Sequence, residues 1–423
     1  MREEKKKFKV LVGLDWADEK HDVKTLDAET LQSSSYVIEN THAGISEWIE
    51  RLNSERCGND VAVCMEHSDG FITGMLLDCA FITLYSLNPL MSTKYRQAFF
   101  PSMSKDDPLD AELLLELVNL HRDRLKPVVI DTEETRALEI LCESRRNIVD
   151  DRTKCIQKLR AALKRYYPQA CSFCGDDLSN DMACDFLLKW PSVELAKHTK
   201  TSTFRNFFYA HNCRSSKLIE ERIANIKGSN SSLKYKLLND SYALFVESYA
   251  KQIKVLNASI RKIEKSINDI YKKHEDEAIF TSLPGAGKVL APRLLVVFGT
   301  DRSRYESASV VQAYSGIAPV MEISGKSKWV HNRWLCPKFM KQSFHEFAEK
   351  SIMYSLWAKA FFIDCQKRGM KHNAAVRALA FKWIRIIFKC WKTRTPYDES
   401  IYIQSLIKHG SPLAKHLIIA DAI

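Results

Sequence analysis

The chain has 423 residues, 45% of them hydrophobic, and a formal net charge of +11. Its length allows roughly two to four globular domains, and the positive charge favours a polyanionic partner. No apolar run reaches the roughly 18 residues that a membrane span needs, so no membrane partner is expected. The 12 cysteines follow no framework spacing, and the charged N-terminus has no apolar signal core. These features exclude a disulfide-stapled secreted domain and predict a cytoplasmic protein.

The first predicted element is a strand over residues 8–15, FKVLVGLD. Hydrophobic residues recur there at every second position, which is the period of a strand. The strand ends at Asp15, and a buried strand can hold a metal ligand rigidly at its end. An aspartate that opens a turn after a strand is a commoner arrangement, and Asp15 taken alone favours that reading.

The next elements alternate between strands and helices up to about residue 130. Short alternating or apolar runs predict strands, and an amphipathic period predicts helices. The predicted strands are 21–27, 34–38, 61–65 and 81–87; the predicted helices are 43–56 and one that starts near Asp107. This order is that of an α/β domain of the ribonuclease-H-like fold, over residues 1–130.

Carboxylates fall at the places where such a fold holds metal ions. Glu66 ends the fourth strand, and Asp107 and Asp110 lie three residues apart on one face of the last helix. With Asp15 they would form an all-oxygen site for two Mg²⁺ ions that supports phosphoryl transfer. Taken one at a time, these acidic residues have simpler explanations. Glu66 could be a solvated residue at a strand end, and Asp107 and Asp110 could stabilise a helix N-terminus by their charge. Asp106 is an alternative to Asp107, and Asp18 is a possible accessory residue.

Residues 131–275 are predicted to be mostly helical. Two long segments, 132–166 and about 240–274, carry apolar residues at helical spacing. They fit an antiparallel coiled coil and an ordinary bundle core equally well. Basic residues between 154 and 165 fit contacts to a nucleic-acid backbone, or a solvated helix face.

Residues 276–423 form a third predicted unit, mostly helical and basic. Its LPGAGK segment, 283–288, lacks the residues of a phosphate-binding nucleotide loop. A helix-hairpin-helix-like turn would let Gly285, Gly287 and Lys288 bind a DNA phosphate; a plain tight turn between helices is the alternative.

A small-residue loop follows at Ser324, Gly325 and Lys326. An exposed serine beside cations can act as a nucleophile, whereas an ordinary Ser-Gly turn is the simpler reading. Ser327 is a rival nucleophile. Basic and aromatic residues surround the loop, among them Lys328, Trp329 and Arg333.

Together these segments resemble the DEDD-type insertion-sequence transposases of the "one-ten" class, relatives of the pilin-gene invertases. The resemblance rests on GLDWADEKHDV, the strand ending at Glu66, KDDPLDA from Lys105, LPGAGKVLAPRLL, AYSGIAPV and the Ser-Gly-Lys at 324–326. The family pattern K-x-D-x-x-D-A selects Asp107 over Asp106. The segment VHNRWLCPKFMKQ departs from the Lys-Arg-Gly-Asn-like run of many members.

The resemblance implies a RuvC-like domain, a coiled-coil linker and a C-terminal transposase domain in a bacterial or archaeal cell, associated with the nucleoid. Asp15, Glu66, Asp107 and Asp110 would bind Mg²⁺, and Ser324 would attack a DNA phosphodiester. Donor and target DNA, a bridge RNA from the same element, and dimers and tetramers of the chain are the implied partners. The expected nucleic-acid contacts are Lys105, Gly285, Gly287, Lys288, Lys326, Lys328 and Arg333. The alternative function is a metal-dependent, structure-specific DNA endonuclease of the Holliday-junction-resolvase type, without a covalent intermediate.

Overall fold

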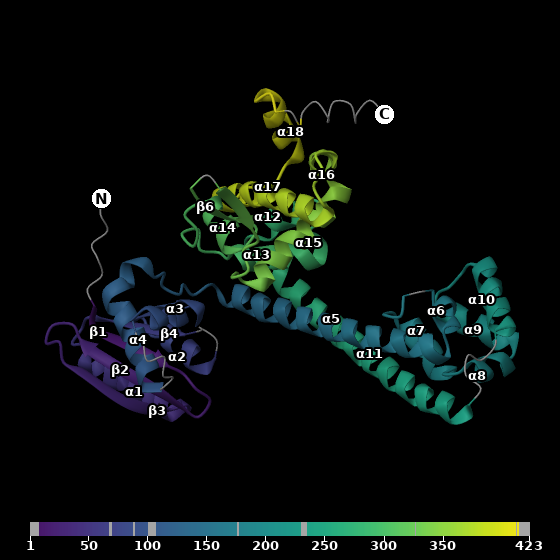
Figure 1. Ribbon diagram of the computed structural model, residues 1–423, viewed down its shortest axis with the longest axis horizontal. Helices are drawn as coiled ribbons and strands as arrows, with labels where there is room; N and C mark the ends of the chain where they lie inside the picture. Colours follow the sequence, from purple (N-terminus) through teal and green to yellow (C-terminus); the bar gives the residue numbers. More distant parts are fainter. Residues whose placement is uncertain are drawn as a thin grey trace. The chain divides into compact units, whose positions relative to one another are not determined.

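The computed structural model describes residues 8–66, 70–87, 89–99, 107–175, 177–229, 235–325, 327–411 and 413; the side chains of Leu90, Asp107 and Pro108 are not described. The chain divides into two compact units, Met1–Ile130 and Asp131–Ile423 (Figure 1). The first unit contains a mixed sheet of five strands, and the second is almost entirely helical. The mixed class predicted from the sequence, α/β followed by α, is confirmed.

The sheet of the first unit has the strand order β3-β2-β1-β4-β5. Strand β1 pairs antiparallel with β2 and parallel with β4, so it lies at the centre. The strands are β1 (Phe8–Asp15), β2 (Lys20–Asp27), β3 (Ser33–Glu39), β4 (Asp60–Glu66) and β5 (Ile82–Leu87). All five predicted strands are therefore confirmed, because period two and short apolar runs mark them clearly.

The two faces of the sheet are covered by different helices. One face carries Val10, Val12 and Leu14 and packs with buried residues of α1 (His42–Glu55) and α2 (Phe71–Leu77). The other face packs on leucines of α4 (Asp107–His121), which is followed by the short helix η1 (Arg122–Arg124). Helix α3 (Pro89–Phe99), which was not predicted, precedes α4.

Gly13 lets α4 lie directly on β1. A Cβ atom at Gly13 would be 2.0 Å from the carbonyl oxygen of Ala111 and 2.4 Å from the amide nitrogen of Leu115. Both atoms belong to the α4 backbone, so no side-chain rotation could make room. The glycine therefore fixes how closely α4 approaches the end of the strand that carries Asp15.

Gly13→Ala should destabilise the protein by about 3 kcal/mol, because helix and strand must separate to admit the methyl group. The matched control is Gly74→Ala in α2, where a Cβ would meet nothing within 4 Å. Urea unfolding followed by circular dichroism measures the difference. Equal unfolding midpoints for the two variants would contradict the contact.

The second unit begins with two long antiparallel helices, α5 (Glu133–Tyr166) and α11 (Lys236–Tyr271), close to their predicted bounds. Their contacts run in opposite directions along the two sequences: Arg145 bonds to Glu264, and Arg152 bonds to Asn257. Five short helices connect them and enclose an aromatic core at one end of the pair (Figure 1). These are α6 (Gln169–Phe173), α7 (Asp181–Lys189), α8 (Val193–His198), α9 (Thr201–Ala210) and α10 (Ser216–Gly228).

The C-terminal part packs around a large core that includes Trp357, Trp383 and Trp391. Its elements are α12 (Glu277–Thr281), α13 (Gly287–Phe298), α14 (Ala308–Tyr314), the hairpin β6 (Val320–Ser324) and β7 (Ser327–His331), α15 (Lys338–Tyr354), α16 (Leu356–Lys367), α17 (His372–Thr393) and α18 (Glu399–Lys408). Among the helices that the structure describes, none has the length and apolar character to cross a membrane.

Candidate functional site

Asp15 and Glu66 lie side by side at one edge of the sheet. Leu14 of β1 pairs with Met65 of β4 in parallel register, so the two acidic residues follow at neighbouring positions. Side chains two residues apart share a face of a strand. Asp15 therefore shares the face of Gly13, which α4 covers, and Glu66 shares the face of Cys64, which packs on leucines of α4.

Helix α4 brings its N-terminus to the same edge. Arg122, just after α4, stacks over the ring of Phe8 at the start of β1. The helix thus runs back along β1, and Asp110 lies at the end where Asp15 and Glu66 stand. Asp110 is buried, with 8% of its surface exposed. The backbone of Asp107 lies one turn earlier in the helix, and its side chain is outside the described residues.

Helix α3 supplies polar partners to two of these carboxylates. The guanidinium of Arg96 forms an ion pair with Asp110, and the hydroxyl of Ser92 donates a hydrogen bond to Glu66. The sequence reasoning missed both residues, although their four-residue spacing puts them on one helix face. Within the described residues, no three carboxylate, histidine or cysteine side chains come close enough to hold a metal ion.

Asp22 is a further acidic residue that the sequence reasoning missed. It lies directly opposite Asp15 in the antiparallel pair of β1 and β2. Lys24, two residues along β2, bonds to Glu112 of α4 at 2.9 Å, so this strand face also points toward α4. Like charges directly opposite each other on a sheet destabilise it unless a cation lies between them. The signal in the sequence is the short turn between β1 and β2, which fixes their register.

The carboxylates at this edge are of the chemical kind that binds a divalent cation, although no three of the described side chains converge on one point. Carboxylate oxygens are the ligands that Mg²⁺ prefers, and strand ends together with a helix N-terminus provide them here. A cationic group already lies at this place, because the Arg96 guanidinium contacts Asp110. The site is therefore acidic, partly buried and able to accept positive charge.

In the second unit, a turn at 283–286 joins α12 to α13, with Gly285 and Gly287 at positive φ angles of 82° and 53°. A Cβ at Gly285 would meet Lys350 and Tyr354 of α15, whereas one at Gly287 would meet nothing within 4 Å. Gly287 and Lys288 are thus exposed in this turn, whereas Gly285 is half-buried against α15.

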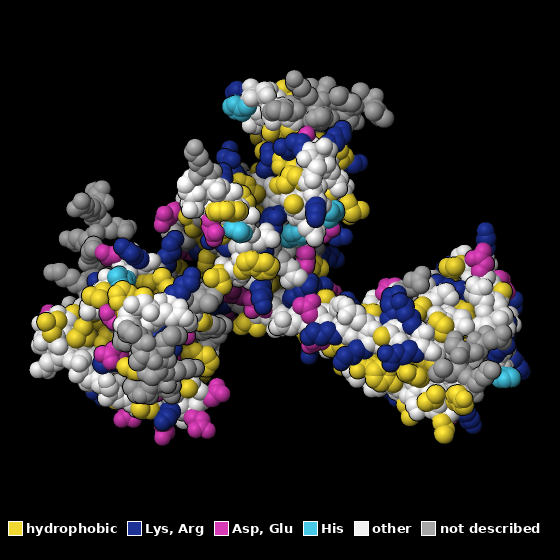
Figure 2. Space-filling view, viewed as in Figure 1, with side chains coloured by type: hydrophobic (Ala, Val, Ile, Leu, Met, Phe, Trp, Pro, Cys, Tyr) yellow, Lys and Arg dark blue, Asp and Glu magenta, His cyan; other side chains and the backbone are white. Residues whose placement is uncertain are grey.

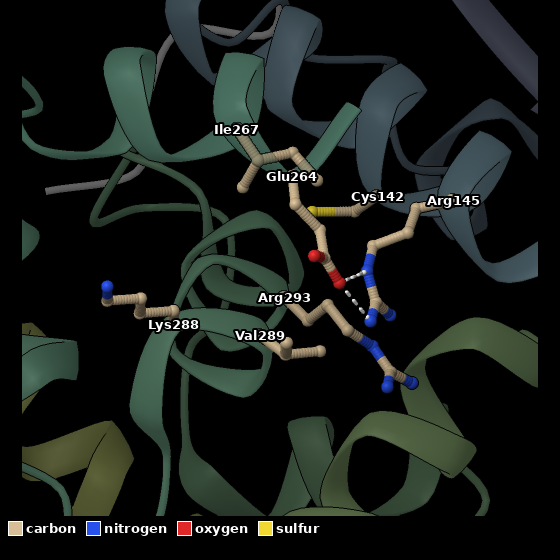
Figure 3. A pocket seen from close by; sticks show the side chains of 7 residues that line it. All are labelled: Cys142, Arg145, Glu264, Ile267, Lys288, Val289 and Arg293. Carbon is tan, nitrogen blue, oxygen red and sulfur yellow. Dashed lines mark hydrogen bonds and ion pairs between the residues drawn. The ribbon is translucent and has the colours of Figure 1, made fainter. Parts of the chain in front are cut away.

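A small cavity of about 10 Å³, enough for one water molecule, lies beside this turn. Figure 3 shows Arg145 bonded to Glu264 there, while the amine of Lys288 points away from that pair. Arg293 of α13 is buried and bonds to Ser343 and Glu346. The first contact joins α5 to α11, and the contacts of Arg293 join α13 to α15, whereas Lys288 is exposed.

Ser324 stands at the tip of the exposed β6–β7 hairpin. It pairs with Ser327 across a two-residue turn in which Gly325 has a φ of 57°, the conformation such turns require. Both serines are exposed, as are Lys328 and His331 on β7. Arg333 is half-buried at the base of the hairpin, and Lys105 and Lys326 lie outside the described residues.

Two family models match the chain and together span more than half of it. One, described as a transposase of the DEDD IS110 type, matches residues 12–168; the other, described as a transposase of the IS116/IS110/IS902 family, matches residues 277–362. The first match contains the carboxylate edge and the second contains the Ser324 hairpin. These matches define the protein as a transposase of insertion elements. It belongs to the IS110 class of DEDD transposases.

Curated relatives agree with this assignment. The "Mini-circle putative transposase for IS117" of Streptomyces coelicolor is 25% identical over 397 residues, which cover 92% of this chain and 95% of the relative. An uncharacterized 42 kDa protein of the insertion element IS900 from Mycobacterium paratuberculosis is 20% identical and covers 92% of this chain and 98% of its own length. An uncharacterized 43.6 kDa protein of IS110 from Streptomyces coelicolor is 22% identical over 71% of this chain and 74% of its own length.

Proposed function

We propose that this transposase cuts and rejoins DNA through a phosphoserine intermediate at Ser324, assisted by a Mg²⁺ site at the carboxylate edge. The observation that carries the proposal is the placement of Asp15, Glu66 and Asp110 at one end of the sheet, on the face that α4 covers. The strand order, with β1 central and parallel to β4, supports a RuvC-like fold for this unit.

The reaction is a transesterification. The oxygen of Ser324 attacks the phosphorus atom and gives up its proton to a solvent base. A bond forms between that oxygen and phosphorus, and one bond between phosphorus and a deoxyribose oxygen breaks. The released oxygen takes up a proton and becomes a hydroxyl group. A hydroxyl on a new strand can reverse these steps, so strand exchange conserves the ester bond and needs no external energy source.

The carboxylates of Asp15, Glu66, Asp107 and Asp110 would hold the metal, with Asp22 close to them. When bound, Mg²⁺ supplies positive charge that stabilises the transferring phosphate and the leaving oxygen. The close approach of the Asp22 and Asp15 carboxylates would be stable only where a bound cation offsets their repulsion. Arg96 and Ser92 would orient Asp110 and Glu66 from α3.

The DNA contacts are proposed on the second unit. The exposed residues Gly287, Lys288 and Lys328 are placed to meet phosphate groups, as is Arg333 at the hairpin base. Lys105, Lys326 and Gly285 remain proposed contacts on the family pattern alone. Lysine and arginine side chains also gather along the α5–α11 pair (Figure 2), where a nucleic-acid backbone could lie. A coiled coil of these helices, and dimers and tetramers on DNA, belong to the same proposal.

A bridge RNA from the same element would select the donor and target DNA. The test is a recombination assay with purified protein, Mg²⁺, donor and target DNA, and the element's RNA. Recombinant junctions should form only when both the RNA and Mg²⁺ are present. Junctions that form equally well without RNA would remove the guide from the proposal and leave the serine chemistry intact.

One observation favours a second function, a metal-dependent endonuclease that uses water as nucleophile. All four carboxylates of the proposed metal site belong to the unit Met1–Ile130, whereas Ser324 belongs to the other unit. Such an enzyme would cut DNA without any covalent protein–DNA complex. The absence or presence of that complex therefore separates the two functions.

A further inference from the structure

The β6–β7 hairpin and the loop that follows it expose two indole rings close together in sequence. Trp329 on β7 is 51% exposed, and Trp334 is 82% exposed. Tryptophan is enriched at binding surfaces because its ring offers a large apolar face and its N–H group can still meet water. The six other tryptophans of the chain are buried or half-buried.

The strand register places Trp329 on the face of the hairpin that carries Ser324. Ser324 pairs with Ser327, and Trp329 follows two residues later, opposite Glu322. Residues two apart share a strand face, so the indole and the Ser324 hydroxyl point to the same side. A flat partner that rests on Trp329 would therefore lie next to Ser324.

The base of the hairpin is held firmly. The amine of Lys341 donates a hydrogen bond of 2.9 Å to the carbonyl oxygen of Arg333, and Arg377 bonds to the side chain of Asn332. Gly316 packs against Cys336 so closely that a Cβ there would lie 2.3 Å from the sulfur. The loop that carries Trp334 is thus fixed at both ends, while the indole of Trp334 remains exposed. This is the arrangement that a preformed binding surface requires.

The charges around the two rings favour a nucleic acid over a protein partner. Lys328 directly precedes Trp329, and Arg333 directly precedes Trp334, so each indole has a cationic neighbour in the sequence. Glu322 is the one acidic residue in the described part of 320–336, and its carboxylate lies 3.5 Å from Nε2 of His331. Aromatic rings beside cations are the usual platform for unpaired bases.

We propose that Trp329 and Trp334 stack on unpaired nucleotides of the DNA or RNA substrate, next to the phosphate that Ser324 attacks. Strand exchange separates base pairs at the cut, and stacked indoles would hold the released bases. The placement beside the attacked phosphate rests on the proposed function of Ser324, whereas the binding of unpaired nucleotides does not.

The test uses the full-length chain and fluorescein-labelled oligonucleotides, one single-stranded and one a duplex of the same sequence, at fixed salt. Trp329→Ala and Trp334→Ala should each weaken single-strand binding about tenfold, as expected for loss of one stacked base. Duplex binding should change less than twofold, and Trp329→Phe should keep most of the single-strand affinity. The matched control is Tyr235→Ala, which removes an aromatic ring that is 72% exposed before α11.

Three results would overturn the inference. If the tryptophan variants lost equal affinity for the single strand and the duplex, the defect would be general. If their single-strand affinity were unchanged, stacking on the indoles would be excluded. Loss of a dimer in sedimentation, with single-strand affinity retained, would assign the surface to a second copy of the chain. Ser324→Ala keeps both indoles and should bind single strands normally, so a failure of the serine proposal would be visible separately.

Discussion

Replacing Ser324 with alanine should abolish the covalent protein–DNA complex and reduce strand exchange by at least about a thousandfold, because the oxygen proposed to attack the phosphorus atom is lost. The change removes one exposed hydroxyl from a two-residue turn whose conformation depends on Gly325. Stability and single-strand binding should therefore remain as in the unmodified chain. The complex is measured on a denaturing gel with labelled DNA.

Ser327→Ala provides the matched control for Ser324. The two serines face each other across the same turn and are both exposed, so they differ only in position. We expect the Ser327 variant to form the covalent complex at the normal level. If Ser327→Ala loses the complex and Ser324→Ala keeps it, the nucleophile is Ser327.

Replacing Asp15 with asparagine should weaken Mn²⁺ binding by roughly a hundredfold, since Asp15 stands at the centre of the carboxylate edge between Asp22 and Glu66. Titration calorimetry with Mn²⁺ in place of Mg²⁺ measures this without DNA or catalysis. Asp78→Asn, at an exposed position directly after α2 and outside the proposed metal site, is the control and should bind normally. Equal affinities in all three proteins would exclude a metal site at this edge.

Asp22→Asn gives a second readout of the same site. The substitution should lower the affinity for Mn²⁺ several-fold. In metal-free buffer it should raise the free energy of unfolding in urea by about 0.5 kcal/mol, because it removes the repulsion between Asp22 and Asp15. A purely structural Asp22 would not give these opposite effects. A lower urea midpoint in metal-free buffer would contradict the assigned repulsion.

The fold of the first unit follows from local patterns in its sequence. Strands such as 8–15 and 61–65 alternate or run apolar over short lengths, and each is bounded by polar turns, so their positions depend little on distant residues. The same holds for the two long helices, whose apolar period persists over more than 30 residues. Asp15 and Glu66 could be placed at strand ends for this reason.

Other features depend on contacts between distant segments. Asp22 matters because of its register with Asp15, which only the short turn between β1 and β2 indicates. Arg96 matters because α3 faces Asp110, which neither segment shows by itself. The short helices α6 to α10 have too few turns for a clear apolar period, and their aromatic core forms only in three dimensions. The exposure of Trp329 and Trp334 could likewise not be inferred from their types, since tryptophan is usually buried.

The most direct test of the central proposal is to identify the atom that carries the DNA. Protein would be incubated with donor and target DNA, the element's RNA and Mg²⁺, denatured, digested with nuclease and protease, and analysed by mass spectrometry. We expect a nucleotide attached through phosphate to the peptide that contains Ser324, on the oxygen of that residue. Cleaved DNA with no nucleotide-bearing peptide would contradict the phosphoserine mechanism and assign the cutting to water at the carboxylate edge.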